Sequence, residues 1–160
     1  MRGFAEPSLF EIAKDAGAIS FRVSYFSPVP VREIAVRLVV NADGSGQVTS
    51  AVSSGTATEV QRTKNNVAIA DVDKFLRLVE EVGFWSMAST DDTEQKTDKA
   101  GRKPYVMDGG WLMVEGVQRG SFHHVFRRNP NPSPVTGIGR YLTKDLAKLD
   151  DSVVPRILSQ

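Results

Sequence analysis

The chain contains no cysteine, which excludes a disulfide framework, a thiol nucleophile, an iron–sulfur cluster and a cysteine-ligated zinc site. It also lacks any apolar run approaching about 18 residues, the length needed for a membrane-spanning helix. Neither sign of charge is in excess, because 20 Lys and Arg stand against 19 Asp and Glu and leave a net charge of +1. This balance argues against a dedicated nucleic-acid binder and against a polybasic membrane protein.

What the chain does contain is typical of one globular domain. Its 160 residues are 41% hydrophobic and 24% charged, enough to bury roughly two-thirds of the unfolded surface in one core. We therefore expect a single domain over residues 1–160. Residues 1–6 carry one basic side chain, and no apolar stretch typical of a signal peptide follows them. This predicts a cytoplasmic protein, with the periplasm as the alternative if an export signal has been removed.

Residue periodicity in the first half predicts a short helix followed by three or four strands. Ser8 and Glu11 have capping-box spacing, and helical periodicity continues to a glycine stop at Gly17. Alternation of apolar and polar residues predicts strands over 19–25 and 34–40. Segments rich in Val, Thr and Ser predict two more strands over 47–54 and 56–63. The Gly-containing segment 41–46 predicts the hairpin turn that precedes them.

A second helix and a polar segment follow. Apolar residues with helical spacing predict a helix capped by Asp71 and ended by Gly83. Phe84 and Trp85 come directly after this glycine and are expected to be buried between the helix and the sheet. Residues 88–104 hold no large apolar side chain, which predicts a mobile surface loop.

The last third predicts a hairpin at about 111–128 and a third helix. Ser133 and Pro134 are a favourable helix start, since a serine caps the first turn and proline suits the first helical position. The tail over residues 151–160 is expected to pack loosely. Strands and helices come in runs, without sustained strand–helix–strand alternation, which predicts an α+β fold. We expect a mainly antiparallel meander sheet of about five or six strands, two longer helices on one face and a short N-terminal helix.

The hairpin carries the only two histidines of the chain. A three-residue loop over 118–120, with glycine at a positive φ, would place Glu115 opposite His123 and Trp111 opposite Arg127. A two-residue loop would give different pairs. We prefer the first register because it separates polar from apolar side chains better. It predicts a binding surface made of Trp111, Glu115, His123 and Arg127.

Two interpretations of Glu115 and His123 follow from this register. A carboxylate that orients an imidazole and raises its pKa would form an acid–base pair. Alternatively, the two side chains form a cross-strand charge pair worth from a few tenths of a kcal/mol to about 1 kcal/mol. We favour the charge pair, because no nucleophile motif accompanies these residues. A metal site would need a third ligand such as Asp108, and we expect no metal.

Several short motifs in the second half resemble a family of small uncharacterised bacterial proteins. The resemblance covers roughly residues 72–150 and implies a bacterial source and a fold, but no reaction. The shared pattern, in chain order, consists of Gly83-Phe84-Trp85, Asp108-Gly109, Trp111, Glu115-Gly116, Gly120 with Phe122-His123, Arg127 and Pro130.

These observations predict a non-enzymatic binding protein, either an inhibitor or immunity-type protein or an accessory domain. The prediction rests on the lack of catalytic and cofactor motifs in one compact domain, and we expect no cofactor. The alternative is a small enzyme that uses Glu115 and His123. We expect the partner to be another protein, with a small molecule as the second option. Nucleic acid and membrane insertion are not expected.

Overall fold

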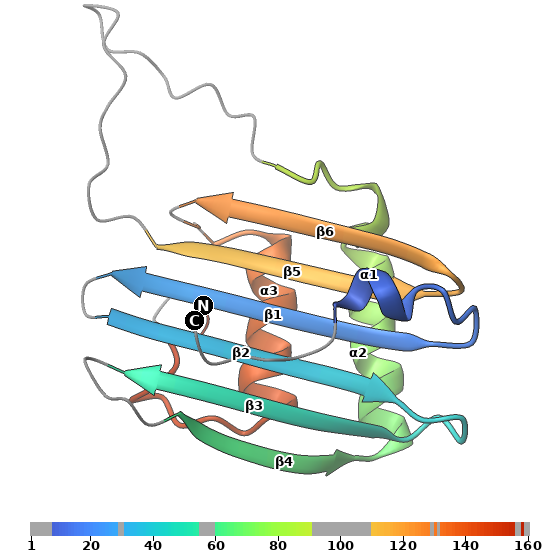
Figure 1. Ribbon diagram of the computed structural model, residues 1–160, viewed down its shortest axis with the longest axis horizontal. Helices are drawn as coiled ribbons and strands as arrows, with labels where there is room; N and C mark the ends of the chain where they lie inside the picture. The colour runs from blue at the N-terminus through green and yellow to red at the C-terminus, as the bar shows by residue number, and fades with distance from the viewer. Residues whose placement is uncertain are drawn as a thin grey trace, which may run out of the picture.

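The computed structural model describes residues 8–28, 31–54, 60–90, 110–128, 130, 132–155 and 158. Six antiparallel strands form one sheet with the order β4-β3-β2-β1-β5-β6, which confirms the predicted α+β fold (Figure 1). The elements are α1 (Leu9–Ile12), β1 (Ile19–Pro28), β2 (Val31–Val40), β3 (Gly46–Ser54), β4 (Gln61–Val67), α2 (Ile69–Glu81), a 3₁₀ turn (Phe84–Ser86), β5 (Trp111–Gln118), β6 (Ser121–Arg128), α3 (Pro134–Arg140) and a π-helical segment (Tyr141–Leu146).

The helices divide between the two faces of the sheet. Helices α2 and α3 lie behind the sheet in Figure 1, and the short α1 lies in front of it. Strand β1 shows which side chains face each way, because successive residues of a strand point to opposite faces. We call the face of Phe21 and Val23 the inner face, and the face of Arg22 and Phe26 the outer face. The core lies between the inner face and the two longer helices, where Phe21 and Phe75 are fully buried.

Helix α2 begins and ends almost where its sequence indicates. It starts at Ile69, with Ala68 at the N-cap, so the prediction that Asp71 caps it is wrong. Asp71 lies in the first turn instead, where a carboxylate still interacts favourably with the helix dipole. Gly83 has a φ of 68° and ends the helix as predicted. The following Phe84 is fully buried, whereas Trp85 is half-buried against the edge of the core.

The first helix departs from expectation, whereas the last helix begins as predicted. Helix α1 ends at Ile12, and the Ser8 side chain makes no capping bond, so the predicted capping box is absent there. Helix α3 has the expected start, in which the Ser133 backbone N–H donates to Thr136 Oγ1 at 2.8 Å.

The C-terminal tail packs more tightly than predicted. Val154 and Leu158 belong to the core, with Leu158 fully buried. Gly139 explains how the tail fits, because a Cβ there would lie 3.0 Å from Leu158 Cδ2. The absent side chain leaves room for the leucine against α3.

The predicted loop 88–104 falls mostly outside the described residues, since its residues 91–104 are not among them. Its first residues are held against β6. The Phe126 N–H donates to the Ser89 carbonyl at 2.7 Å, and Thr90 forms a parallel bridge with Phe126. The strand predicted over 56–63 is observed later, at Gln61–Val67.

Candidate functional site

The turn of the β5–β6 hairpin sets the position of every predicted site residue. Gln118 pairs with Ser121, so the turn has two residues, Arg119 with φ of 52° and Gly120 with φ of 75°. Positive φ at both central positions is the geometry of a type I′ turn. The predicted three-residue loop is therefore wrong.

This register separates the predicted site residues onto both faces of the sheet. Glu115 pairs with His124 rather than His123, and Trp111 pairs with Arg128 rather than Arg127. Trp111 and Glu115 consequently lie on the outer face. His123 and Arg127 lie on the inner face. Glu115 and His123 cannot act together, because their side chains point to opposite sides of the sheet.

His123 is a packing residue at the edge of the core. Its ring meets the Phe84 ring edge-on, with centroids 5.1 Å apart and planes at 78°, and lies 6.4 Å from the Trp85 ring. Nε2 is buried without a hydrogen-bond partner within the described part of the chain. The backbone of Met87 also acts on the ring through hydrogen bonding.

The environment of His123 favours the neutral ring. Burial is the largest influence and lowers the pKa of His123, and the neighbouring His124 lowers it further. The bond with the Met87 backbone acts in the opposite direction. The predicted rise of this pKa through Glu115 is thus wrong, because the carboxylate is on the other face.

Arg127 contacts the segment 88–90, which follows α2 and the 3₁₀ turn. Its guanidinium donates to the Ala88 carbonyl at 3.1 Å and to the Phe126 carbonyl at 2.9 Å. Together with the bond from Phe126 to Ser89, this contact fixes residues 88–90 along β6.

Glu115 forms an ion pair on the outer face that the sequence did not indicate. Arg22 Nε donates to Glu115 Oε2 at 2.6 Å, with side-chain exposures of 17% and 9%. Arg37 pairs with Arg22 on the other side, and its Nε donates to Ser20 Oγ at 3.3 Å. The Ser20 hydroxyl in turn donates to the Leu38 carbonyl at 2.8 Å. Polar side chains thus form a row across the middle of the outer face.

An aromatic cluster lies beside this polar row. We use the term aromatic cluster for Phe26, Trp111 and Phe126, which come from three neighbouring strands and are all half-buried. The ring centroids of Trp111 lie 6.0 Å from those of both Phe26 and Phe126, with interplanar angles of 25° and 35°. Arg128 pairs directly with Trp111 at the edge of the sheet and is exposed. Tryptophan, phenylalanine and arginine are enriched in protein interfaces.

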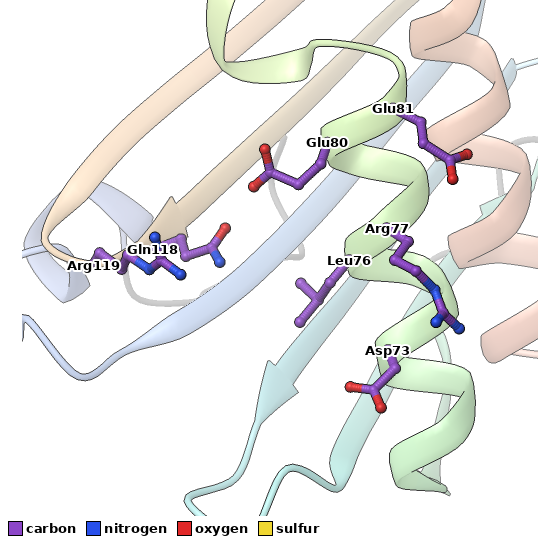
Figure 2. Close-up of a pocket in the computed structure, with 7 residues that line it drawn as sticks. All are labelled: Asp73, Leu76, Arg77, Glu80, Glu81, Gln118 and Arg119. Carbon is purple, nitrogen blue, oxygen red and sulfur yellow. The ribbon is translucent and has the colours of Figure 1, made fainter.

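A hollow of about 530 Å³ lies between α2 and the β5–β6 turn (Figure 2). Leu76 and Glu80 extend from α2 toward Gln118, whereas Arg77 and Glu81 extend from the opposite side of the helix. Three carboxylates and two guanidinium groups line the hollow, and no hydroxyl or imidazole is among the lining side chains. No nucleophile therefore lies beside a base among the residues that line this hollow.

A second hollow, of about 440 Å³, opens beside α1 and is bordered by β1 and β2. Ser20, Arg37 and Val39 from the outer face line part of it. The hollow therefore continues the outer face toward the end of the sheet that α1 occupies.

Asp108, considered as a third metal ligand with Glu115 and His123, lies outside the described residues. Across the described ranges, no group of three or more His, Cys, Asp or Glu is placed to hold a metal ion.

Sequence reasoning missed Arg22, Phe26 and Phe126 as parts of the outer face. The alternation in β1 already placed Arg22 on the polar side, between Ser20 and Ser24. The missing information was that β5 pairs with β1, which brings Glu115 to Arg22 across the long connection between these strands.

Comparison of the chain with protein-family models, with curated proteins and with solved structures gives no match. Within the parts of the chain that the structure describes, no helix has the length and apolar character required to span a membrane.

Proposed function

We propose that this chain is a non-enzymatic binding domain, of inhibitor, immunity or accessory type, that contacts a partner protein with the outer face of its sheet. The observation that carries the proposal is the aromatic cluster of Phe26, Trp111 and Phe126. The two longer helices lie on the inner face, so this cluster is not part of the core beneath them. Half-buried aromatic side chains gathered beside an arginine provide the large contact area of an interface hot spot.

The balance of charge favours a protein over a single-stranded nucleic acid. Twenty basic side chains stand against nineteen acidic ones, whereas proteins that bind single strands track the backbone with a positively charged groove. The ring centroids of Trp111 lie 6.0 Å from those of Phe26 and Phe126, so the three rings form one continuous apolar surface.

We assign a structural role to the hairpin residues that carry the family resemblance. Phe84 packs on His123, and a Cβ at Gly116 would lie 2.8 Å from the Phe84 ring. Residues far apart in the sequence therefore meet on the inner face as one packing unit. Membership of that bacterial family, and a cytoplasmic location with the periplasm as alternative, remain part of the proposal on the sequence argument alone.

Site-specific photo-crosslinking in the source cells tests the proposal. A benzophenone amino acid replaces Met113, which lies on the outer face beside the cluster, or Glu81, an exposed residue of α2, as the control. We expect one discrete protein adduct from position 113 and none from position 81. Trp111→Ala should abolish the adduct, whereas Trp111→Phe should retain it. No adduct from position 113, or an adduct that is insensitive to Trp111→Ala, would refute the proposal.

A further inference from the structure

The hollow beside α1 combines aliphatic walls with a single charge of each sign. Its volume of about 440 Å³ lies within the range of roughly 300–1,000 Å³ that is typical of small-molecule sites. Among the described residues that line it, Asp15 is the one acidic and Arg37 the one basic side chain. A ligand in this hollow therefore meets a guanidinium, a carboxylate and an apolar surface together. The aliphatic lining residues are Ile12, Ala18, Ile19, Val39, Val40 and Ala42.

Arg37 presents a guanidinium that a buried hydroxyl orients. Its Nε donates to Ser20 Oγ at 3.3 Å, and Ser20 is only 1% exposed. The Ser20 hydroxyl is fixed in turn, because it donates to the Leu38 carbonyl at 2.8 Å. A guanidinium carries several N–H donors in one plane, and their directions match both oxygens of a carboxylate. This recognition depends on the direction of the donors rather than on an excess of positive charge, so it is compatible with the contacts that Arg37 already makes.

Asp15 lies in the turn between α1 and β1. Its Oδ1 accepts a hydrogen bond from the Gly17 N–H at 2.9 Å, which fixes the carboxylate within the turn. The turn is held to the sheet through α1, where Leu9 is fully buried and the Phe10 ring meets the Phe122 ring edge-on at 5.8 Å. An ionised carboxylate accepts about four hydrogen bonds, so Asp15 keeps acceptor positions for an ammonium group.

We propose that this hollow is a binding site for a free aliphatic α-amino acid such as leucine. Such a molecule carries a carboxylate for Arg37, an ammonium group for Asp15 and an aliphatic side chain for the apolar walls. Both charges of the ligand are then compensated, and the aliphatic side chain contributes affinity because its surface is removed from water. This site goes beyond the proposed function, because it takes a small molecule and lies beside α1 rather than at the aromatic cluster.

The two charges of the hollow disfavour related small molecules. A dicarboxylate or a phosphate ester brings a second negative charge near Asp15, and a diamine brings a second positive charge near Arg37. A purely aliphatic ligand covers both charged groups without bonding to either, which costs part of their hydration. A zwitterion with an aliphatic side chain is the class in which each lining group has a counterpart.

Ligand analogues that each lack one group test the site on the purified full chain. The probes are L-leucine, leucinamide without the carboxylate, 4-methylpentanoate without the ammonium group, and glycine without the aliphatic side chain. Binding is followed in ¹H–¹⁵N NMR spectra through the backbone amides of Gly17 and Ala18, which line the hollow. We expect a saturable shift with L-leucine. Each analogue should bind at least about tenfold more weakly, because it loses a charge-assisted bond or the apolar contact.

Matched substitutions in the two hollows locate the binding. Arg37→Gln and Asp15→Asn each remove one charge from the hollow beside α1, and Arg77→Gln and Asp73→Asn make the same changes in the hollow beside α2. We expect the first pair to weaken the binding of L-leucine at least about tenfold and the second pair to leave it unchanged. Asp15→Asn keeps an oxygen for the Gly17 N–H, so it tests the site even when Arg37→Gln does not fold.

Three results would overturn the amino-acid site. The first is the absence of a saturable shift with L-leucine, and the second is equal affinity for L-leucine and any of its analogues. The third is an equal effect of the two pairs of substitutions.

Discussion

Gly116 lies beneath two fully buried aromatic rings, and replacing it with alanine tests how the hairpin is joined to the core. A Cβ at this position would be 2.7 Å from Phe21 Cε1 and 2.8 Å from Phe84 Cε1. Carbon atoms in contact are about 3.5–4.0 Å apart, so each ring must move by almost 1 Å. Phe21 also packs on Phe75, which limits this movement.

The expected cost follows from this crowding. Overpacking in a close-packed core typically costs about 1–3 kcal/mol, and two immobile rings place Gly116→Ala in the upper half of that range. Since 1 kcal/mol lowers the Tm of a domain of this size by about 2–4 °C, we expect a decrease of about 4–12 °C. Urea unfolding followed by circular dichroism measures the free energy of unfolding directly.

Gly137→Ala is the matched control for this substitution. Gly137 is in α3, and a Cβ there would meet no atom within 4 Å. Alanine should therefore stabilise the chain by about 0.5–1 kcal/mol through its higher helix propensity. A Gly116→Ala variant as stable as the native chain would refute the close packing of Phe21 and Phe84 on β5.

Two further predictions concern titration and the buried ion pair. Burial lowers the pKa of His123 in the folded chain. The residue therefore contributes stability above about pH 6.5, its unfolded pKa, and this contribution is lost as the pH falls through the folded pKa. The stability difference between the native chain and His123→Gln should therefore narrow between about pH 7 and pH 5, and a pH-independent difference in urea unfolding would contradict this. Glu115→Gln leaves Arg22 without its carboxylate and should cost about 2–3 kcal/mol, less than for full burial because Arg22 keeps 17% side-chain exposure. Arg22→Met with Glu115→Leu should recover most of that loss in the same unfolding assay, and failure to recover it would refute a penalty due to the unpaired charge.

The sequence predicted the architecture well, because its strongest signals are local. Alternation in β1 and β2, the helical period of α2 and the Ser133-Pro134 start of α3 all lie where the structure has them. The burial of the C-terminal tail was not predictable from the sequence. It depends on the space that Gly139 leaves for Leu158, and these two residues meet only in the folded chain.

The predicted site residues do not share one face of the sheet, and the reason is the conformation of a single turn. Arg119 adopts a positive φ, which is uncommon for residues other than glycine, asparagine and aspartate. That conformation shortens the loop by one residue, and a one-residue change of register moves every side chain of β6 to the opposite face. His123 and Arg127 thereby became packing residues, while His124 and Arg128 took their places on the outer face.

The two tryptophans of the chain provide the most direct measurement of the central claim, that the outer face is the binding surface. Trp111 belongs to the aromatic cluster on the outer face, and Trp85 packs against Phe21 on the inner side. Their indole N–H groups give separate signals in a ¹H–¹⁵N NMR spectrum, which is recorded while the partner identified by crosslinking is added. If the partner binds the outer face, the Trp111 signal shifts and the Trp85 signal stays in place. A shift of Trp85 alone, or no change in either signal at saturation, would contradict binding at the outer face.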